Sequence, residues 1–217
     1  MRVAPPPCQG EGWGEGGAPS PSQGEGWGEG GFSMKSAQRT EQAWFEQLLT
    51  TLQGAGPVGG AIAATIRGRR IRLGFARQST GACWFDWRRL HFGVFLNADY
   101  AGRRPDDVWL VALLAHEARH LQQGVLEALS VRGELEAWQL QYDVLAWLSA
   151  EPRDETWREL RALNPTSCAD LQRARALMRQ LAGPYYRIYW LPLWPLPAEV
   201  GHQLKDVGRR VLRLMGI

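Results

Sequence analysis

Apolar residues recur at helical spacing in the first half of the chain. Within residues 40–53 they are Ala43, Trp44, Leu48, Leu49 and Leu52. Steps of three and four residues place such side chains on one face of a helix. Thr40 is a suitable N-cap, and Gly54 follows the last apolar position. The pattern therefore predicts an amphipathic helix over residues 40–53.

The next segments follow patterns that are typical of strands. Ile71-Arg-Leu-Gly-Phe75 alternates between apolar and other residues, and Phe92-Gly-Val-Phe-Leu96 is compact and apolar. Both patterns, with a turn signal at Gly68, indicate β-structure. We predict strands over residues 61–66, 70–77 and 91–97, and a weaker strand over residues 83–87.

Helical patterns return downstream of the strands. The run Val108-Trp-Leu-Val-Ala-Leu-Leu-Ala115 is apolar on nearly every side, and Pro105-Asp106-Asp107 before it suits the start of a buried helix. A second helix starts near Gly133 and ends before Pro152. Further helices are expected over residues 154–163, 168–181 and 198–215, whereas four prolines keep residues 183–197 out of regular helix. This order of elements predicts an α+β fold.

The end of the buried apolar helix carries the sequence His116-Glu117-Ala118-Arg119-His120, an HExxH motif. Two histidines four residues apart on a helix face the same way and can bind one Zn²⁺, with Glu117 beside them. Buried histidines and a buried glutamate need partners, and a metal ion satisfies all three. The motif predicts a zinc hydrolase. In the alternative interpretation, both histidines lie at the surface of the last helical turn, where cations complement the helix dipole.

A catalytic zinc site normally has a third protein ligand. Glu127 is too close to the motif, because the chain must first leave the helix and turn back. Glu134 and Glu136 both lie on the following helix. Glu136 shares a face with apolar residues, and the small Ala137 beside it lets the two helices approach, so we favour Glu136. Glu134 stays an alternative, since nearly every face of this helix carries apolar residues.

The motif, followed by a glutamate helix that contains Glu134-Leu-Glu-Ala137, resembles the gluzincin metallopeptidases, especially their minimal single-domain forms. The resemblance covers about residues 62–148. It implies a small twisted antiparallel or mixed sheet that packs on the motif helix and on the glutamate helix. The later helices are then C-terminal additions.

The resemblance also implies an activity, the hydrolysis of peptide bonds in a peptide or protein substrate. One Zn²⁺ per chain, held by His116, His120 and Glu136, would activate a water molecule, and Glu117 would act as general base and then as acid. Asp99 and Asp143 are candidate acceptors for the other ring N–H groups of the histidines. Candidates to stabilise the oxyanion are Tyr142, Tyr185, Tyr186, Tyr189 and His202.

A second hypothesis comes from a different class of protein. In this hypothesis the chain is a non-catalytic interaction or regulatory module, of the kind that can also act on nucleic acid, with a structural HExxH helix and an interface in its aromatic C-terminal segment. The net charge is only +3, from 25 basic and 22 acidic residues. No dense basic run accompanies a nucleic-acid motif, so we do not expect nucleic acid as a partner.

The first 33 residues differ in composition from the rest. The nine-residue sequence from Gln9 to Gly17 recurs identically from Gln23 to Gly31, and it is rich in Gly and Glu. Such a segment cannot build a core, so we expect residues 1–33 to be disordered. Our hypothesis is that the functional chain begins at Met34; the rival is a short acidic interaction tail. Residues 34–217 would form one domain, with a core over 61–150 and an extension over 151–217.

The sequence also indicates where the protein is located. It contains no run of about 18 apolar residues and no signal-peptide pattern, so we expect no membrane span. The three cysteines at positions 8, 83 and 168 have no metal-binding or disulfide spacing. This usage is typical of a reducing compartment, and the expectation is a cytoplasmic protein.

Overall fold

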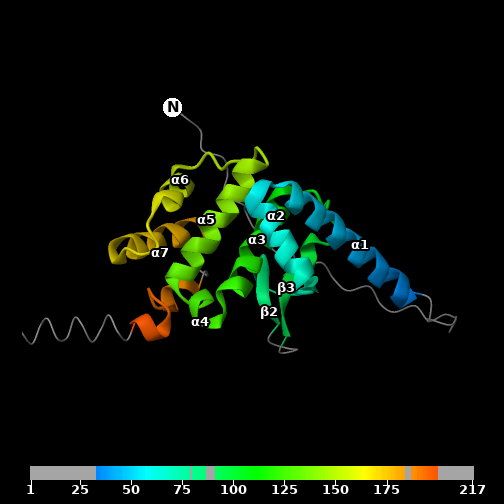
Figure 1. Cartoon of the computed structure of the whole chain (residues 1–217), viewed down its shortest axis with the longest axis horizontal. Helices are drawn as coiled ribbons and strands as arrows, with labels where there is room; N and C mark the ends of the chain where they lie inside the picture. The colour runs from blue at the N-terminus through cyan, green and yellow to red at the C-terminus, as the bar shows by residue number, and fades with distance from the viewer. Residues whose placement is uncertain (1–32, 79, 87–90, 184–186, 200–217) are drawn as a thin grey trace, which may run out of the picture.

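The structure, a computed structural model, describes residues 33–78, 80–86, 91–183 and 187–199 (Figure 1). Segment 1–32 and most of the helix expected over residues 198–215 lie outside the described residues. Figure 1 shows helices α3 and α5 in the middle of the molecule, with α1 and α2 on one side and α6 and α7 on the other.

The chain begins with two helices, α1 (Ser33–Gly54) and α2 (Gly56–Gly68). The predicted cap at Thr40 is wrong, because α1 begins earlier. The strand predicted over residues 61–66 is also wrong, since this segment lies inside α2. Pro57 in the first turn favours a helix start, and Ile62 and Ile66 are four residues apart and buried on one face. Short apolar runs are ambiguous between helix and strand, and here packing against α1 decides for helix.

The sheet contains the other three predicted strands. These are β1 (Arg72–Ala76), β2 (Ala82–Asp86) and β3 (His91–Asn97). The order is β1-β3-β2, with β1 parallel and β2 antiparallel to β3. Helices and this small mixed sheet confirm the predicted α+β class.

The motif helix and the glutamate helix are α3 (Val108–Gln123) and α5 (Val131–Trp147), joined through the short helix α4 (Val125–Ala128). Asp107 caps α3 by accepting a hydrogen bond from the amide of Trp109 at 3.0 Å. Ser130 caps α5 in the same way through the amide of Gly133. Helix α5 therefore begins two residues before the predicted start at Gly133.

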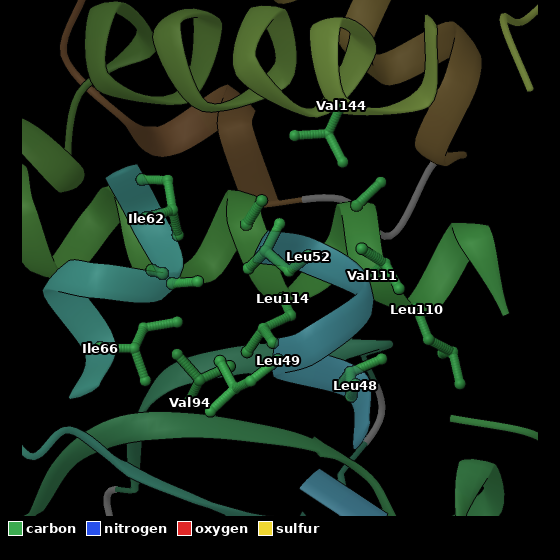
Figure 2. Packing of buried hydrophobic residues seen from close by; sticks show 14 of the residues in the cluster. Leu48, Leu49, Leu52, Ile62, Ile66, Val94, Leu110, Val111, Leu114 and Val144 are labelled. Atoms are coloured by element: carbon green, nitrogen blue, oxygen red, sulfur yellow. The ribbon is translucent and has the colours of Figure 1, made fainter. Parts of the chain in front are cut away.

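The main core lies between α1, α2, α3, α5 and the sheet. Figure 2 shows side chains from these elements pointing toward one another. The labelled residues are Leu48, Leu49, Leu52, Ile62, Ile66, Val94, Leu110, Val111, Leu114 and Val144. Because α3 lies in this core, the motif at its C-terminal end starts from a rigidly packed position.

A second core cluster joins the C-terminal part to α5. It involves α6 (Glu155–Ala162), α7 (Cys168–Ala182) and the 3₁₀ helix η2 (Arg187–Trp190). The backbone amides of Val131 and Arg132 donate to the carbonyls of Pro192 and Leu193 at 2.9 and 3.1 Å. The proline-rich segment thus packs against the start of α5, next to the glutamates. Among the described residues, no helix is both long enough and apolar enough to cross a membrane.

Candidate metal centre

The two histidines and the glutamate of the motif lie inside the protein. Exposed fractions are 6 % for His116, 7 % for Glu117 and 2 % for His120. The apolar first half of α3 buries the helix against the core, and the motif follows on the same packed helix. The alternative that placed both histidines at the surface is therefore wrong.

Helix α5 brings a glutamate to this histidine pair. The Nε2 atoms of His116 and His120 are 3.2 Å apart. Glu134 places Oε2 at 3.7 Å from Nε2 of His116, and Oε1 at 3.7 Å from Nε2 of His120. The candidate ligand atoms of all three residues lie within 4.8 Å of one another. Two residues of one helix and one residue of another thus form a compact donor cluster.

The spacing of these donors fits a single zinc ion. Nitrogen and oxygen ligands at about 2.0–2.2 Å in tetrahedral geometry lie roughly 3.3–3.6 Å from each other. The histidine nitrogens are 3.2 Å apart, and each of the two Glu134 oxygens lies 3.7 Å from one of them, so each of these separations is close to that range. Two imidazoles and one carboxylate also form a donor set that is typical of catalytic zinc. Both the chemistry and the spacing therefore fit this ion.

Glu136, which the sequence analysis favoured as the third ligand, belongs to a different group of side chains. Its Oε2 accepts hydrogen bonds from Arg119 Nη2 at 2.8 Å and from Gln123 Nε2 at 3.1 Å. Arg132 approaches its Oε1 at 3.4 Å. The geometry favours Glu134 instead, as a correction to that choice. Arg119 and Gln123 each lie three residues after a motif histidine on α3. Glu136 therefore contacts the side chains that lie next to the ligand histidines on this helix.

Gln123 orients the second histidine of the motif. Its Nε2 donates to the carbonyl of Gly133 at 2.9 Å and to Glu136 at 3.1 Å. The amide oxygen therefore faces His120, where it lies 3.0 Å from Nδ1. Since this oxygen can only accept, Nδ1 of His120 carries the proton, and Nε2 presents its lone pair to the donor cluster. The sequence analysis missed Gln123, although its place one turn after His120 was a usable signal.

The electrostatics of the cluster follow from burial. Burial lowers the pKa of His120 to about 4, so this ring is neutral at neutral pH. Burial raises the pKa of Glu117 to about 7, and the charge of His116 opposes this shift. For His116, burial disfavours the charged form, but the hydrogen bond to Glu134 and the charge of Glu117 outweigh it and raise the pKa. The carboxyl groups of Glu117 and Glu134 lie beside two buried imidazoles, and this arrangement favours the binding of a cation.

Other candidates from the sequence lie elsewhere. Asp143 forms a salt bridge with Arg161 at 3.0 Å, and Asp99 is exposed in the 3₁₀ helix η1 (Ala98–Tyr100). The hydroxyl of Tyr142 donates to Glu151, and Tyr189 is an exposed residue of η2. Neither aspartate belongs to the donor cluster. The remaining oxyanion candidates, Tyr185, Tyr186 and His202, lie outside the described residues.

Comparisons of the chain with families of proteins, with curated proteins and with solved structures find no match.

Proposed function

We propose that this protein is a zinc-dependent metallopeptidase in which His116, His120 and Glu134 bind the metal ion. One observation carries the proposal: a glutamate of α5 lies 3.7 Å from both histidines of an HExxH motif on α3. If the HExxH sequence occurred by chance, a third candidate ligand from another helix would not be expected beside its histidines. The burial of both histidines and the half-buried position of Glu134 add to this support.

The ligand residues and Glu117 would have separate roles. Bound at this cluster, Zn²⁺ supplies a Lewis acid that polarises a carbonyl and acidifies a water molecule. Glu117 is the general base in the proposal, because it lies between the two ligand histidines in sequence and is buried with them. Among the described residues, it forms no salt bridge with an arginine, so its carboxylate stays available for proton transfer.

The residues around the cluster hold the two helices in a fixed relation. Arg119 on α3 pairs with Glu136 on α5 at 2.8 Å, and Gln123 bonds to both Glu136 and Gly133. These contacts lie on either side of Glu134 in the sequence of α5. Preorganised ligands of this kind are what a catalytic metal site requires.

The interaction-module hypothesis also has one observation in its favour. Trp190 is 82 % exposed and Tyr189 is 59 % exposed, and both belong to the aromatic C-terminal segment. Large exposed aromatic side chains are common where proteins bind each other. This second candidate predicts binding of a partner protein without any requirement for metal, so metal content separates the two.

The decisive experiment is the zinc content of protein purified without a histidine tag. We expect about one zinc per chain in the wild type, and loss of the metal in His116→Ala and in Glu134→Ala. Glu136→Gln is the matched control, because it changes a carboxylate two residues away, keeps an oxygen that accepts from Arg119 and Gln123, and should retain zinc. A wild-type protein that binds no zinc, even when zinc is supplied, would exclude the proposal.

Activity is tested next on the zinc-loaded protein. A mixture of unstructured peptides with varied sequences, analysed by mass spectrometry, reports cleavage at any type of peptide bond. The wild type should cleave, whereas Glu117→Gln should keep its zinc and lose cleavage by at least about a hundredfold. Equal cleavage by both proteins would assign the activity to a contaminant.

A further inference from the structure

We infer that an apolar groove beside the metal centre binds one large apolar side chain of a peptide substrate, adjacent to the bond that is cut. The groove is defined by Ile71, Trp84, Phe85, Phe92, Val125 and Leu129. This inference rests on the proposed function for its choice of a peptide as the ligand. It adds the class of residue that the peptide must carry.

The groove begins beside His120, one residue of the candidate metal centre. Its first part is a cavity of about 330 Å³, and His120 forms part of the wall together with Trp84, Phe92 and Val125. Ligand cavities have volumes of about 300–1,000 Å³, so this one suits a single side chain better than a large cofactor. A side chain that fills it lies against a metal ligand. The peptide bond next to that side chain is therefore the one presented to the metal centre.

The groove continues away from the metal centre along the sheet. A second part of about 210 Å³ shares Trp84, Phe92 and Val125 with the first, and Phe85 and Leu129 extend its lining. One wall thus comes from β2 and β3, and the other from α4 and the residue after it. The occupant can be longer than a single methyl or isopropyl group.

Aromatic packing makes the sheet wall rigid. The rings of Trp84 and Phe92 stack with centroids 6.0 Å apart and planes inclined by 16°. Phe85 packs on Phe92 at 4.9 Å, and Trp84 reaches the ring of His120 at 6.2 Å. Interlocked rings lose little entropy when a ligand binds, so they form a preorganised contact surface.

The groove leaves apolar surface in contact with water. Phe92 is 55 % exposed, and Val125 and Leu129 are each 43 % exposed. A cluster of exposed apolar side chains in a concave region is typical of a binding site. Arg69, which directly follows α2, is the charged residue in the lining of the first part. The lining is otherwise apolar apart from His120, which disfavours an acidic or amide side chain as the occupant.

Binding of defined peptides tests the inference without requiring catalysis. The probes are fluorescein-labelled heptapeptides that differ only at the central residue, which is Phe, Leu, Ala or Asp. Fluorescence polarisation measures their affinity for the Glu117→Gln protein in the presence of zinc. Burial of a whole Leu or Phe side chain corresponds to roughly 10- to 150-fold in affinity. We expect the Phe and Leu peptides to bind at least about tenfold more tightly than the Ala and Asp peptides.

Two variants locate the effect in the groove. Phe92→Ala removes one ring from the sheet wall, and it should reduce the preference for Phe over Ala by at least about fivefold. The control is Leu126→Ala, because Leu126 is 52 % exposed and adjacent to Val125 but lines neither part of the groove. This control should keep the preference of the parent protein. Equal binding of all four peptides, or equal loss in both variants, would overturn the inference.

The outcomes separate this inference from the proposed function. Wild-type protein that cleaves the Ala peptide as fast as the Phe peptide would be a peptidase without the groove preference. Protein that binds the Phe peptide selectively but cleaves none of the four would have the groove without the proposed activity. Selective binding together with selective cleavage supports both.

Discussion

The amide oxygen of Gln123 lies 3.0 Å from Nδ1 of His120, and this contact decides which ring nitrogen of the histidine faces the donor cluster. Both hydrogens of the same amide are used by Gly133 and Glu136, so the amide cannot turn over without losing two bonds. A neutral side chain thus has the orienting role that is often taken by a carboxylate or a backbone carbonyl.

Replacement of Gln123 should weaken zinc binding. Gln123→Leu leaves His120 without its acceptor, and loss of such an orienting partner typically costs 10- to 100-fold in metal affinity. Gln123→Glu keeps an acceptor and should bind zinc more tightly than Gln123→Leu. Competition with a chromophoric chelator measures both affinities. Unchanged affinity in Gln123→Leu would show that the contact has no orienting role.

Gly133 lies where α5 passes close to α4, so its replacement by a larger residue should destabilise the fold. A Cβ atom at this position would collide with the backbone carbonyl of Glu127, and a backbone group cannot move aside cheaply. Gly133→Ala should destabilise the fold by about 1–3 kcal/mol and displace the neighbouring Glu134. Gly60→Ala is the control, because its new Cβ would only make an ordinary contact at 3.6 Å. Urea denaturation and zinc affinity are the measurements, and equal stability of the two variants would contradict the prediction.

The ion pairs of Glu136 predict a dependence of stability on pH. Burial disfavours its charged form, but hydrogen bonds from Gln123 and Arg119 outweigh burial and lower the pKa below the ordinary 4.5. Because the folded state holds the proton less tightly than the unfolded state, the stabilisation is present above pH 4.5 and is lost as the pH falls through the lowered pKa.

A comparison of wild type and Glu136→Gln measures this contribution. In the presence of a chelator, the wild type should be more stable by about 1–2 kcal/mol at pH 7, after allowance for solvent screening of the partly exposed pair. The difference should shrink as the pH falls below 4.5. A difference that stays constant with pH would mean that the charge of Glu136 does not stabilise the fold.

Zinc should raise the melting temperature of the protein. A ligand that binds only the folded state at one hundred times its dissociation constant stabilises by about 2.7 kcal/mol. For a domain of this size, that energy corresponds to a shift of roughly 5–10 °C. Differential scanning fluorimetry with zinc, and then with excess chelator, measures the shift. His120→Ala should show no comparable shift, and an equal shift in this variant would place the zinc elsewhere.

The fold could be predicted where the pattern was local and long enough. Residues 91–97 were expected to form a strand, and β3 has those same bounds. The apolar run before His116 likewise predicted α3. Residues 61–66 were misassigned, because a short, mostly apolar run is compatible with both the helical and the strand periodicity. Only the contact between α2 and α1 distinguishes helix from strand here. At Gly59, for example, a side chain would meet the backbone carbonyl of Leu52.

By itself, the sequence determined that His116 and His120 face the same way, because a spacing of four residues on a helix is a local property. Which glutamate joins them was decided only by the tertiary structure. Ser130 sets the start of α5, and the close contact of Gly133 with α4 sets its rotation. Glu134 then faces the histidines while Glu136 faces Arg119. Two residues along a helix change the direction of a side chain by about 200°, and the rotation of α5 depends on contacts with other elements.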